Sequence, residues 1–143
     1  MGAWGFRPYD LRTLLHQQHS RLVTKAAAQW KGHTPTELIA QLRACASSAR
    51  RAPGAAPVDP LVDIIVHGQD IARPLERNWQ TPTERVAAAL DHVVASRFYG
   101  ARKRLRGARL TATDTDWTYG DGPEEIHGSV TDLLLVATGR QAA

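Results

Sequence analysis

The sequence predicts a mainly α protein of the α+β class, with several helices followed by a small β-hairpin and a C-terminal helix. Apolar residues recur at helical spacing through most of the first hundred residues. A Thr-rich, alternating stretch near 109–117 is typical of a half-buried strand. A leucine-rich run after Ser129 predicts the last helix. We expect residues 1–100 to form a helical region and 101–143 a small αβ segment packed on the same domain.

The first two helices have recognisable start signals. Asp10 can cap a helix whose apolar residues continue at helical spacing to Trp30, with Gly32 ending it. Thr34-Pro35-Thr36-Glu37 is a capping box, with proline at the first helical position and glutamate at the third. An apolar stripe then predicts one buried face; its residues are Leu38, Ile39, Leu42 and Cys45.

Residues 49–58 hold two prolines and a glycine and predict a linker. Asp59-Pro60 begins a third helix, which Pro74 ends. Thr81-Pro82-Thr83-Glu84 repeats the capping-box pattern and predicts a fourth helix. We expect its buried face to contain Val86, Ala89, Leu90, Val93 and Val94, and to extend to Phe98.

The pattern changes after a basic stretch at 102–109. Residues 109–117 predict one strand, Asp121-Gly122 a turn, and the surroundings of Ile126 a short second strand. Ser129 can cap the last helix, with Asp132 at its third position, and Gly139 can end it.

Composition sets limits on the class of protein. The chain has 143 residues, a net charge of +4 and a single cysteine, Cys45, which we expect to be buried. One cysteine cannot form an internal disulfide, and the sequence has neither a secretory signal nor an apolar run long enough for a membrane span. We therefore expect a cytoplasmic protein. Walker loops, dinucleotide fingerprints and nucleophile elbows are absent from the sequence.

The third helix carries the most informative pattern. It is apolar nearly all round, which is normal for a buried helix. Its polar residues Asp63, His67 and Asp70 are four and three positions apart, so they share one face. A carboxylate and an imidazole one turn apart can hold a divalent ion such as zinc. Alternatively, Asp63 and His67 bond each other, and Asp70 pairs with Arg73 or another arginine.

Other candidates have ordinary structural explanations beside the functional ones. His16 and His19 could face one ion but have a polar neighbourhood, and His33, His92 and His127 fit surface or half-buried positions. The basic stretch at 102–109 permits nucleic-acid binding, although a solvated basic face is the preferred explanation. Trp117 and Tyr119 could line a pocket, or they could pack the hairpin onto the helices.

Two segments carry a family resemblance. VDPLVDIIVHGQDIARPL at 58–75 and LTATDTDWTYGDGPEEIHGSVTDLLLVATGR at 110–140 resemble the mycothiol-dependent maleylpyruvate isomerase-like family, within the DinB-like metalloprotein group. The resemblance implies a DinB-like helical bundle followed by a small αβ segment. It implies a metal, usually zinc, held by three side chains, two of which map onto Asp63 and His67. Family members tend to have glutamate where this chain has the shorter Asp63.

The resemblance also implies two N-terminal helices, the second with a Gly-Trp segment and the third ligand, a histidine. The chain has no such stretch before Phe6, so we expect an N-terminally shortened family member with an incomplete bundle. His16 or His19 could replace the missing ligand only in a rearranged bundle. The apolar faces meant for the absent helices would be exposed, and formation of a homodimer would cover them.

The leading hypothesis is a metal-dependent isomerase or transferase that uses mycothiol or another low-molecular-weight thiol on a small-molecule substrate. Asp63 and His67 would be metal ligands, Asp70 would orient His67, and Arg73 would bind an anionic group of the cofactor. The rival hypothesis is a non-catalytic homodimeric interaction or ligand-binding module on the same scaffold. Nucleic-acid binding through 102–109 ranks last.

Overall fold

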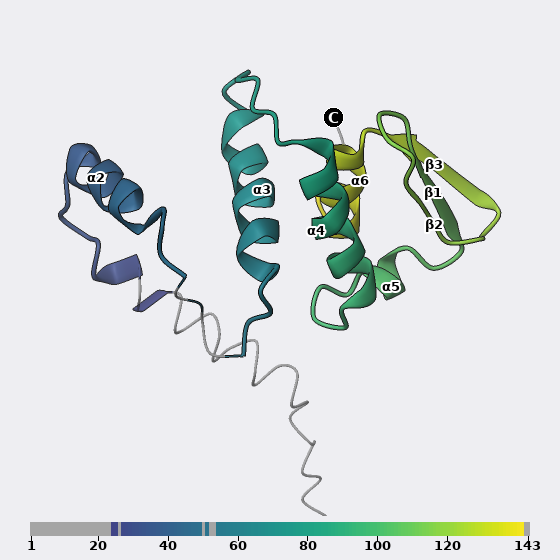
Figure 1. Ribbon diagram of the computed structural model, residues 1–143, viewed down its shortest axis with the longest axis horizontal. Coiled ribbons are helices and arrows are strands. Elements are labelled where there is room, and N and C mark those ends of the chain that lie inside the picture. Colours follow the sequence, from purple (N-terminus) through teal and green to yellow (C-terminus); the bar gives the residue numbers. More distant parts are fainter. Residues whose placement is uncertain (1–23, 26, 50, 52–53, 142–143) are drawn as a thin grey trace, which may run out of the picture. The chain divides into compact units, whose positions relative to one another are not determined.

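The computed structural model describes residues 24–25, 27–49, 51 and 54–141 (Figure 1). Within these ranges the protein is mainly α with one small sheet, so the predicted α+β class is confirmed. The chain forms two compact units, Met1–Arg50 and Arg51–Ala143. None of the helices in the described ranges has both the length and the apolar content that a bilayer crossing requires.

The first unit contains helix α2, Pro35–Cys45. Its capping box is confirmed: Glu37 N–H donates to the Thr34 hydroxyl (3.3 Å), and Thr34 N–H donates to the Glu37 carboxylate (2.7 Å). None of its residues is buried, and Leu42 is 73% exposed. The expectation that Cys45 is buried is wrong: its side chain is exposed. The helix predicted from Asp10 lies largely outside the described residues.

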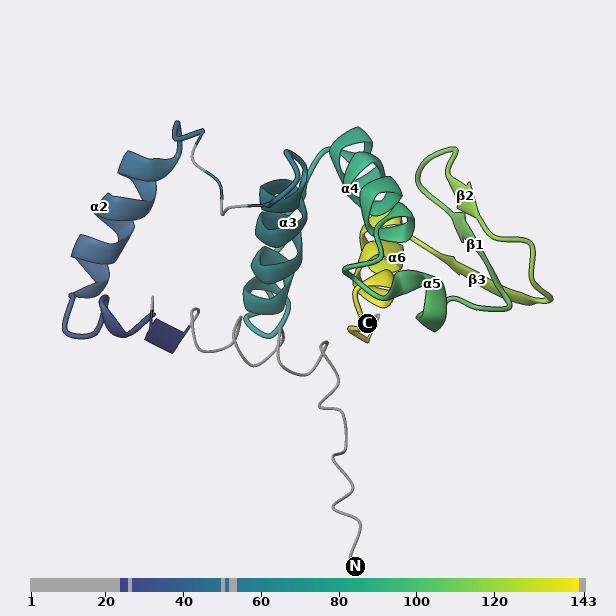
Figure 2. The same ribbon diagram turned by 90° about the horizontal axis from the view of Figure 1, so that it is seen from below.

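The second unit is a layered arrangement of helices on a sheet. In chain order its elements are α3 (Asp59–Ala72), α4 (Thr83–Ala95), α5 (Ala101–Arg104), β1 (Ala108–Ala112), β2 (Thr118–Tyr119), β3 (Glu124–Gly128) and α6 (Val130–Ala137). Helix α4 packs against α3 and against α6, and α6 also contacts β1 and β3. Figures 1 and 2 both show α4 and α6 between α3 and the sheet.

The hydrophobic core lies around α4. The predicted buried face of this helix is confirmed: Val86, Ala89, Leu90 and Val93 are fully buried and Val94 is nearly so. Fully or almost fully buried residues of the neighbouring elements complete the core, and they are Val62, Ile65, Leu110, Val130, Leu133 and Leu134. The expected continuation to Phe98 is wrong: α4 ends at Ala95, and the Phe98 side chain is 80% exposed.

The start of α4 differs from its prediction. The pattern at 81–84 matches that at 34–37, yet the N-cap of α4 is Pro82 and no side chain caps it. The Pro82 carbonyl accepts the first helical hydrogen bonds, from the N–H groups of Arg85 (3.0 Å) and Val86 (3.2 Å). The helix therefore begins one residue later than a capping box at Thr81 requires.

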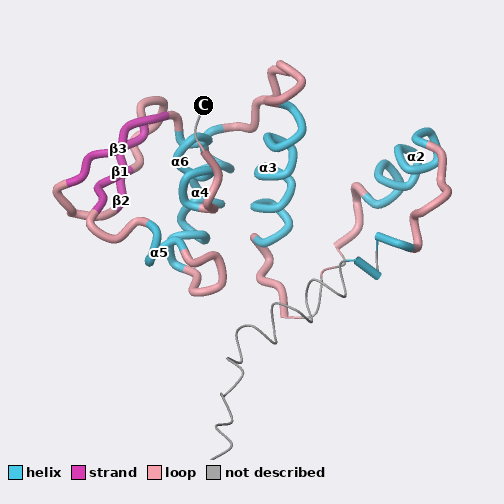
Figure 3. The backbone as a smooth tube through the Cα atoms, turned by 180° about the vertical axis from the view of Figure 1, so that it is seen from behind, coloured by secondary structure: helices cyan, strands magenta, loops and turns pink. Residues whose placement is uncertain are grey.

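The sheet has the strand order β2-β1-β3. The expected hairpin between 109–117 and the strand near Ile126 is wrong: β1 ends at Ala112 and forms a hairpin with β2, with Leu110 opposite Tyr119. The strand predicted near Ile126 is confirmed as β3, but it pairs parallel to β1, with Leu110 opposite Ile126. Figure 3 shows the three strands side by side in one sheet. Trp117 is 8% exposed and donates its indole N–H to Asp91 on α4 (2.8 Å). Trp117 therefore packs the hairpin onto the helices.

Both ends of α6 agree with the sequence. The Ser129 hydroxyl accepts the N–H of Asp132 (3.1 Å), and Gly139 follows the helix with a φ of 88°. A further contact comes from the turn after β1, where Asp114 accepts the N–H of Val130 (2.8 Å). A carboxylate at this position also complements the helix dipole. The N-terminus of α6 is thus fixed both by its cap and by the sheet.

Adjacent isoleucines on α3 test which face of the helix packs inside the unit. Ile65 is 1% exposed and Ile64 is 60% exposed. We predict that Ile65→Ala lowers the free energy of unfolding by about 2–5 kcal/mol, because it leaves a cavity against α4. Ile64→Ala should change it by less than about 0.5 kcal/mol in dilute solution. Urea unfolding measures the free energy of unfolding of both variants. Equal decreases in the two variants would contradict the assignment of Ile65 to the buried face.

Candidate functional site

The polar stripe of α3 lies on the exposed side of the helix. The His67 side chain is 65% exposed, the Asp70 side chain 39%, and Asp63 is exposed as well. The opposite side is buried, and its residues are Val62, Ile65, Val66, Gln69 and Ala72. The expectation of a helix buried nearly all round is wrong within the second unit, because α4 packs against only one side of α3.

Two of the three stripe residues are linked to each other and to the end of the chain. His67 Nδ1 lies 3.2 Å from Asp70 Oδ2. Arg140, which follows α6, donates Nε to Asp70 Oδ1 (2.9 Å) and Nη2 to Asp70 Oδ2 (2.9 Å). Asp70 therefore pairs with an arginine other than Arg73, which is one of the pairings that the alternative interpretation of the sequence predicted. The hydrogen bonds of the described residues do not include one between Asp63 and His67.

The charge state of Asp70 determines the role of His67. Hydrogen bonds from Arg140 hold the pKa of Asp70 below its usual value, and they outweigh the opposing effect of burial. An ionised carboxylate only accepts hydrogen bonds, so the neutral imidazole must carry its proton on Nδ1. The Nε2 atom of His67 is then the nitrogen with a free lone pair.

Arg73 is the C-cap residue of the same helix but belongs to a different group of contacts. Its Nε donates to Gln69 Oε1 (3.0 Å), and its Nη2 donates to Asp132 Oδ1 on α6 (2.6 Å). Its Nη1 is the one buried side-chain nitrogen or oxygen in the described residues that has no hydrogen-bond partner. Asp132 also accepts a hydrogen bond from the Ser129 hydroxyl (2.6 Å). Arg73 thus connects the buried side of α3 to the capped start of α6.

The described residues contain no cluster of three His, Cys, Asp or Glu side chains that could surround one metal ion. Asp63 and His67 supply two candidate donors on one helix face. His16 and His19 lie outside the described residues. Of the other histidines, His33 lies near the Trp30 carbonyl (3.2 Å) and His127 near Glu125 (3.3 Å). A complete site would need a donor beyond those that the second unit brings together.

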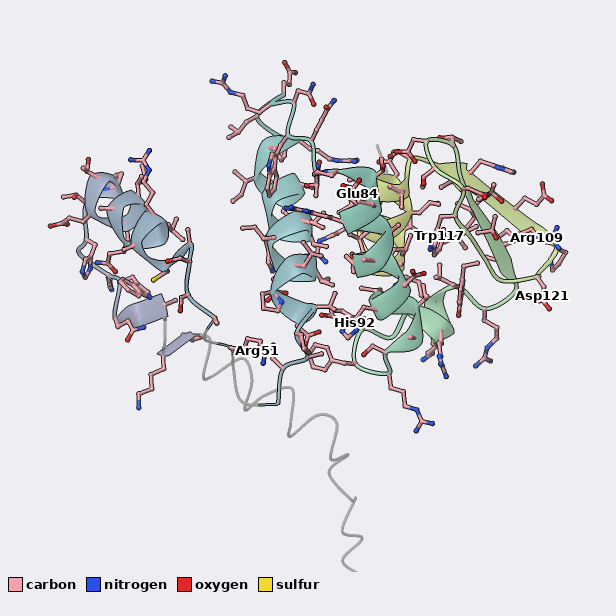
Figure 4. All side chains as sticks on the ribbon, viewed as in Figure 1. Arg51, Glu84, His92, Arg109, Trp117 and Asp121 are labelled. Atoms are coloured by element: carbon pink, nitrogen blue, oxygen red, sulfur yellow. The ribbon has the colours of Figure 1, made fainter. Side chains whose placement is uncertain are left out.

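A polar cluster that the sequence did not reveal joins the start of α3 to the end of α4. Asp59 Oδ1 accepts the Tyr99 hydroxyl (2.8 Å) and lies 2.8 Å from His92 Nε2, while Asp59 Oδ2 accepts the N–H of Ala56 (2.7 Å). Figure 4 shows His92 near the C-terminal end of α4. Burial and the Asp59 carboxylate raise the pKa of Tyr99, so its hydroxyl remains a donor. His92 is therefore a structural contact.

The basic stretch at 102–109 has a structural role at two of its arginines. Arg102 Nε donates to the carbonyl of Val94 near the end of α4 (3.4 Å). Arg104 Nη1 donates to the carbonyl of Ala137, the last residue of α6 (2.5 Å). Arginines at these positions satisfy free carbonyls and complement the negative end of the helix dipole. Arg109 lies at the end of the sheet away from α4 (Figure 4).

Comparisons with protein-family models, with curated proteins and with solved structures found no match to this chain.

The ionised aspartates predict how stability depends on pH. Burial raises the pKa of Asp59, but hydrogen bonds from Tyr99, His92 and Ala56 together hold that pKa below its usual value. The pKa of Asp132 is also lowered, because hydrogen bonds from Ser129 and Arg73 outweigh burial. Carboxyl groups with lowered folded-state pKa values stabilise the fold above their unfolded-state pKa, near 4, and this stabilisation is lost as pH falls through the folded-state values.

We predict that Asp59→Asn lowers the free energy of unfolding at neutral pH by about 1–2 kcal/mol, since it removes an ionised acceptor of three hydrogen bonds. The variant should lose less stability than the wild type when pH is lowered from about 5 to 2. Urea unfolding over this pH range measures the effect. Asp121→Asn, an exposed site at the end of the sheet, is the control. An equally steep pH dependence in Asp59→Asn would contradict the assignment.

Proposed function

We propose that this chain is a DinB-like protein related to the mycothiol-dependent maleylpyruvate isomerases, and that it acts as a metal-dependent isomerase or transferase with a thiol cofactor. The segments at 58–75 and 110–140 support the family assignment by their resemblance to it. The observation that supports the metal function is the contact of His67 Nδ1 with Asp70, which Arg140 holds in turn. A carboxylate that orients a histidine in this way is a common arrangement behind metal ligands.

The donor set on α3 fits a zinc-like ion in part. His67 offers Nε2, and Asp63, one turn earlier, offers a carboxylate on the same exposed face. Asp70 would act as the positioning residue of His67. The third donor would have to come from a helix that covers this face. When bound, the metal would supply Lewis-acid chemistry or stabilise a cofactor thiolate.

The cofactor would be mycothiol or another low-molecular-weight thiol, and the substrate a small molecule. A cytoplasmic location is part of the same proposal, because reduced thiol cofactors and a single free cysteine both suit a reducing compartment. The proposal does not assign Arg73 to this face, because its guanidinium contacts Gln69 and Asp132.

The metal proposal predicts a specific effect of His67. Purified full-length protein should bind zinc saturably in isothermal titration calorimetry, and His67→Ala should weaken that affinity at least about tenfold, because it removes a ligand. Asp70→Asn should weaken it by about ten- to a hundredfold, since the histidine loses its orienting carboxylate. His127→Ala is a matched control, because His127 is also exposed and also lies beside a carboxylate. Equal loss in His127→Ala, or no zinc binding by the wild type, would contradict the proposal.

A specific observation also favours the rival function, a non-catalytic homodimeric module. The exposed side of α3 carries Ile64 (60% exposed) and Ile71 (65%) beside the polar stripe, and Leu75 (63%) is exposed in the turn that follows the helix. These three residues are called the apolar stripe below. Exposed large apolar side chains that gather on one side of a helix are typical of interfaces. A two-fold contact between copies would pair the stripe with itself. We propose that a second copy of this chain covers the stripe.

The dimer proposal predicts that Ile71→Lys dissociates the protein to a monomer, because a buried lysine would lie at the centre of the apolar contact. Sedimentation equilibrium of the wild type and the variant measures the molar mass. Phe98→Lys is the control, since Phe98 is 80% exposed but does not lie on α3. A monomeric wild type, or dissociation by both substitutions, would contradict the proposed interface.

A further inference from the structure

The second unit contains a polar cavity on the side of α3 that does not carry the metal candidates. Its volume is about 430 Å³, within the range of small-molecule sites. Its walls come from the end of α3, the segment between α3 and α4, the start of α4, the turn after β1 and the start of α6. Asp63, His67 and Asp70 do not line it.

One wall of the cavity is built by a close contact between Trp79 and Gly68. A Cβ atom added to Gly68 would lie 0.9 Å from the Trp79 ring, so the indole occupies the space above the glycine backbone. Gln69 Nε2 donates to the Trp79 carbonyl (2.9 Å) and fixes the same loop to α3. The loop that bears Arg77, Asn78 and Gln80 is thereby held beside Arg73.

Arg73, which lines the cavity, has an unsatisfied hydrogen-bonding group. Its Nε and Nη2 have partners, while Nη1 is buried and has none within the described residues. A charged donor removed from water costs free energy unless an acceptor reaches it. The guanidinium that lines the cavity therefore keeps a hydrogen-bonding capacity that the described residues do not use.

The remaining lining groups include several hydrogen-bond donors. Arg77 is exposed and has no ion pair in the part of the chain that the structure describes. The side-chain amides of Asn78 and Gln80 also line the cavity, together with the hydroxyls of Thr81, Thr83 and Thr131. The charge of Arg73 is balanced by Asp132, and Asp114 is held at the start of α6 by the N–H of Val130. Among the described residues that line the cavity, the cation without a partner is therefore Arg77.

From these observations we propose that the cavity binds a small, oxygen-rich carboxylate. Its carboxylate would pair with Arg77, beside the guanidinium of Arg73, and its other oxygens would accept from the amides and hydroxyls of the lining. Guanidinium groups suit carboxylates because their planar donors match two oxygens. The site shares no residue with the proposed metal centre, so either can fail alone.

The test is a nuclear magnetic resonance titration of the full ¹⁵N-labelled chain with sodium succinate, at ionic strength held constant with sodium chloride. We expect saturable shifts of the Trp79 indole and of the backbone amides of Thr81, Thr83 and Thr131. Arg77→Gln should raise the dissociation constant at least about tenfold, because it removes the unpaired cation. Arg77 is exposed, so this substitution leaves the fold intact.

Arg109→Gln removes the same charge at the far end of the sheet and should leave the dissociation constant within about twofold. Succinamide, the uncharged analogue, should cause no saturable shift. If both arginine substitutions raised the dissociation constant equally, the effect would reflect general charge attraction, and the proposed site would be wrong. Equal binding of succinamide, or tighter binding of inorganic phosphate, would overturn the assignment to a carboxylate.

Discussion

The packing of α4 between α3 and α6 is the contact on which the rest of the second unit depends. Val86, Ala89, Leu90 and Val93 are fully buried there. Because α4 takes up one side of α3, the other side keeps its polar and apolar stripes exposed. Helix α6 packs on the other side of α4. Residues at both ends of α6 contact the C-terminal part of α3: Asp132 contacts Arg73, and Arg140 contacts Asp70. Both proposed sites are consequences of this arrangement of three helices.

Features that depend on a few neighbouring residues could be predicted from the sequence. The caps at Thr34 and Ser129 each involve a partner three positions away, and both formed as expected. The same reasoning failed at Thr81, where the helix starts at Thr83 and the Pro82 carbonyl takes the first helical bonds. A cap motif states which hydrogen bonds are possible, but the surrounding structure selects among them. Thr81 and Thr83 line the cavity instead.

Features that depend on distant residues could not be predicted. Asp70 and Arg140 are 70 positions apart, Arg73 and Asp132 are 59 apart, and Asp59 and Tyr99 are 40 apart. Helical periodicity places Asp63, His67 and Asp70 on one face but does not say whether a neighbour covers that face. Periodicity therefore predicted correctly that these three residues share a face, but the prediction that this face is buried was wrong. The parallel pairing of β3 with β1 is likewise a non-local choice, which the turn at Asp121-Gly122 alone did not indicate.

The metal site and the dimer contact proposed for the exposed face of α3 are physically compatible. Ile64 follows Asp63 and Ile71 follows Asp70, so the apolar stripe is rotated by only about 100° from the polar one. A two-fold contact brings the same residues of two copies toward one axis. An axis near the boundary between the stripes would cover the isoleucines and bring a second Asp63 and His67 close to the first pair. The donor that one copy lacks would then be supplied by the other, in a site that exists only in the assembled protein.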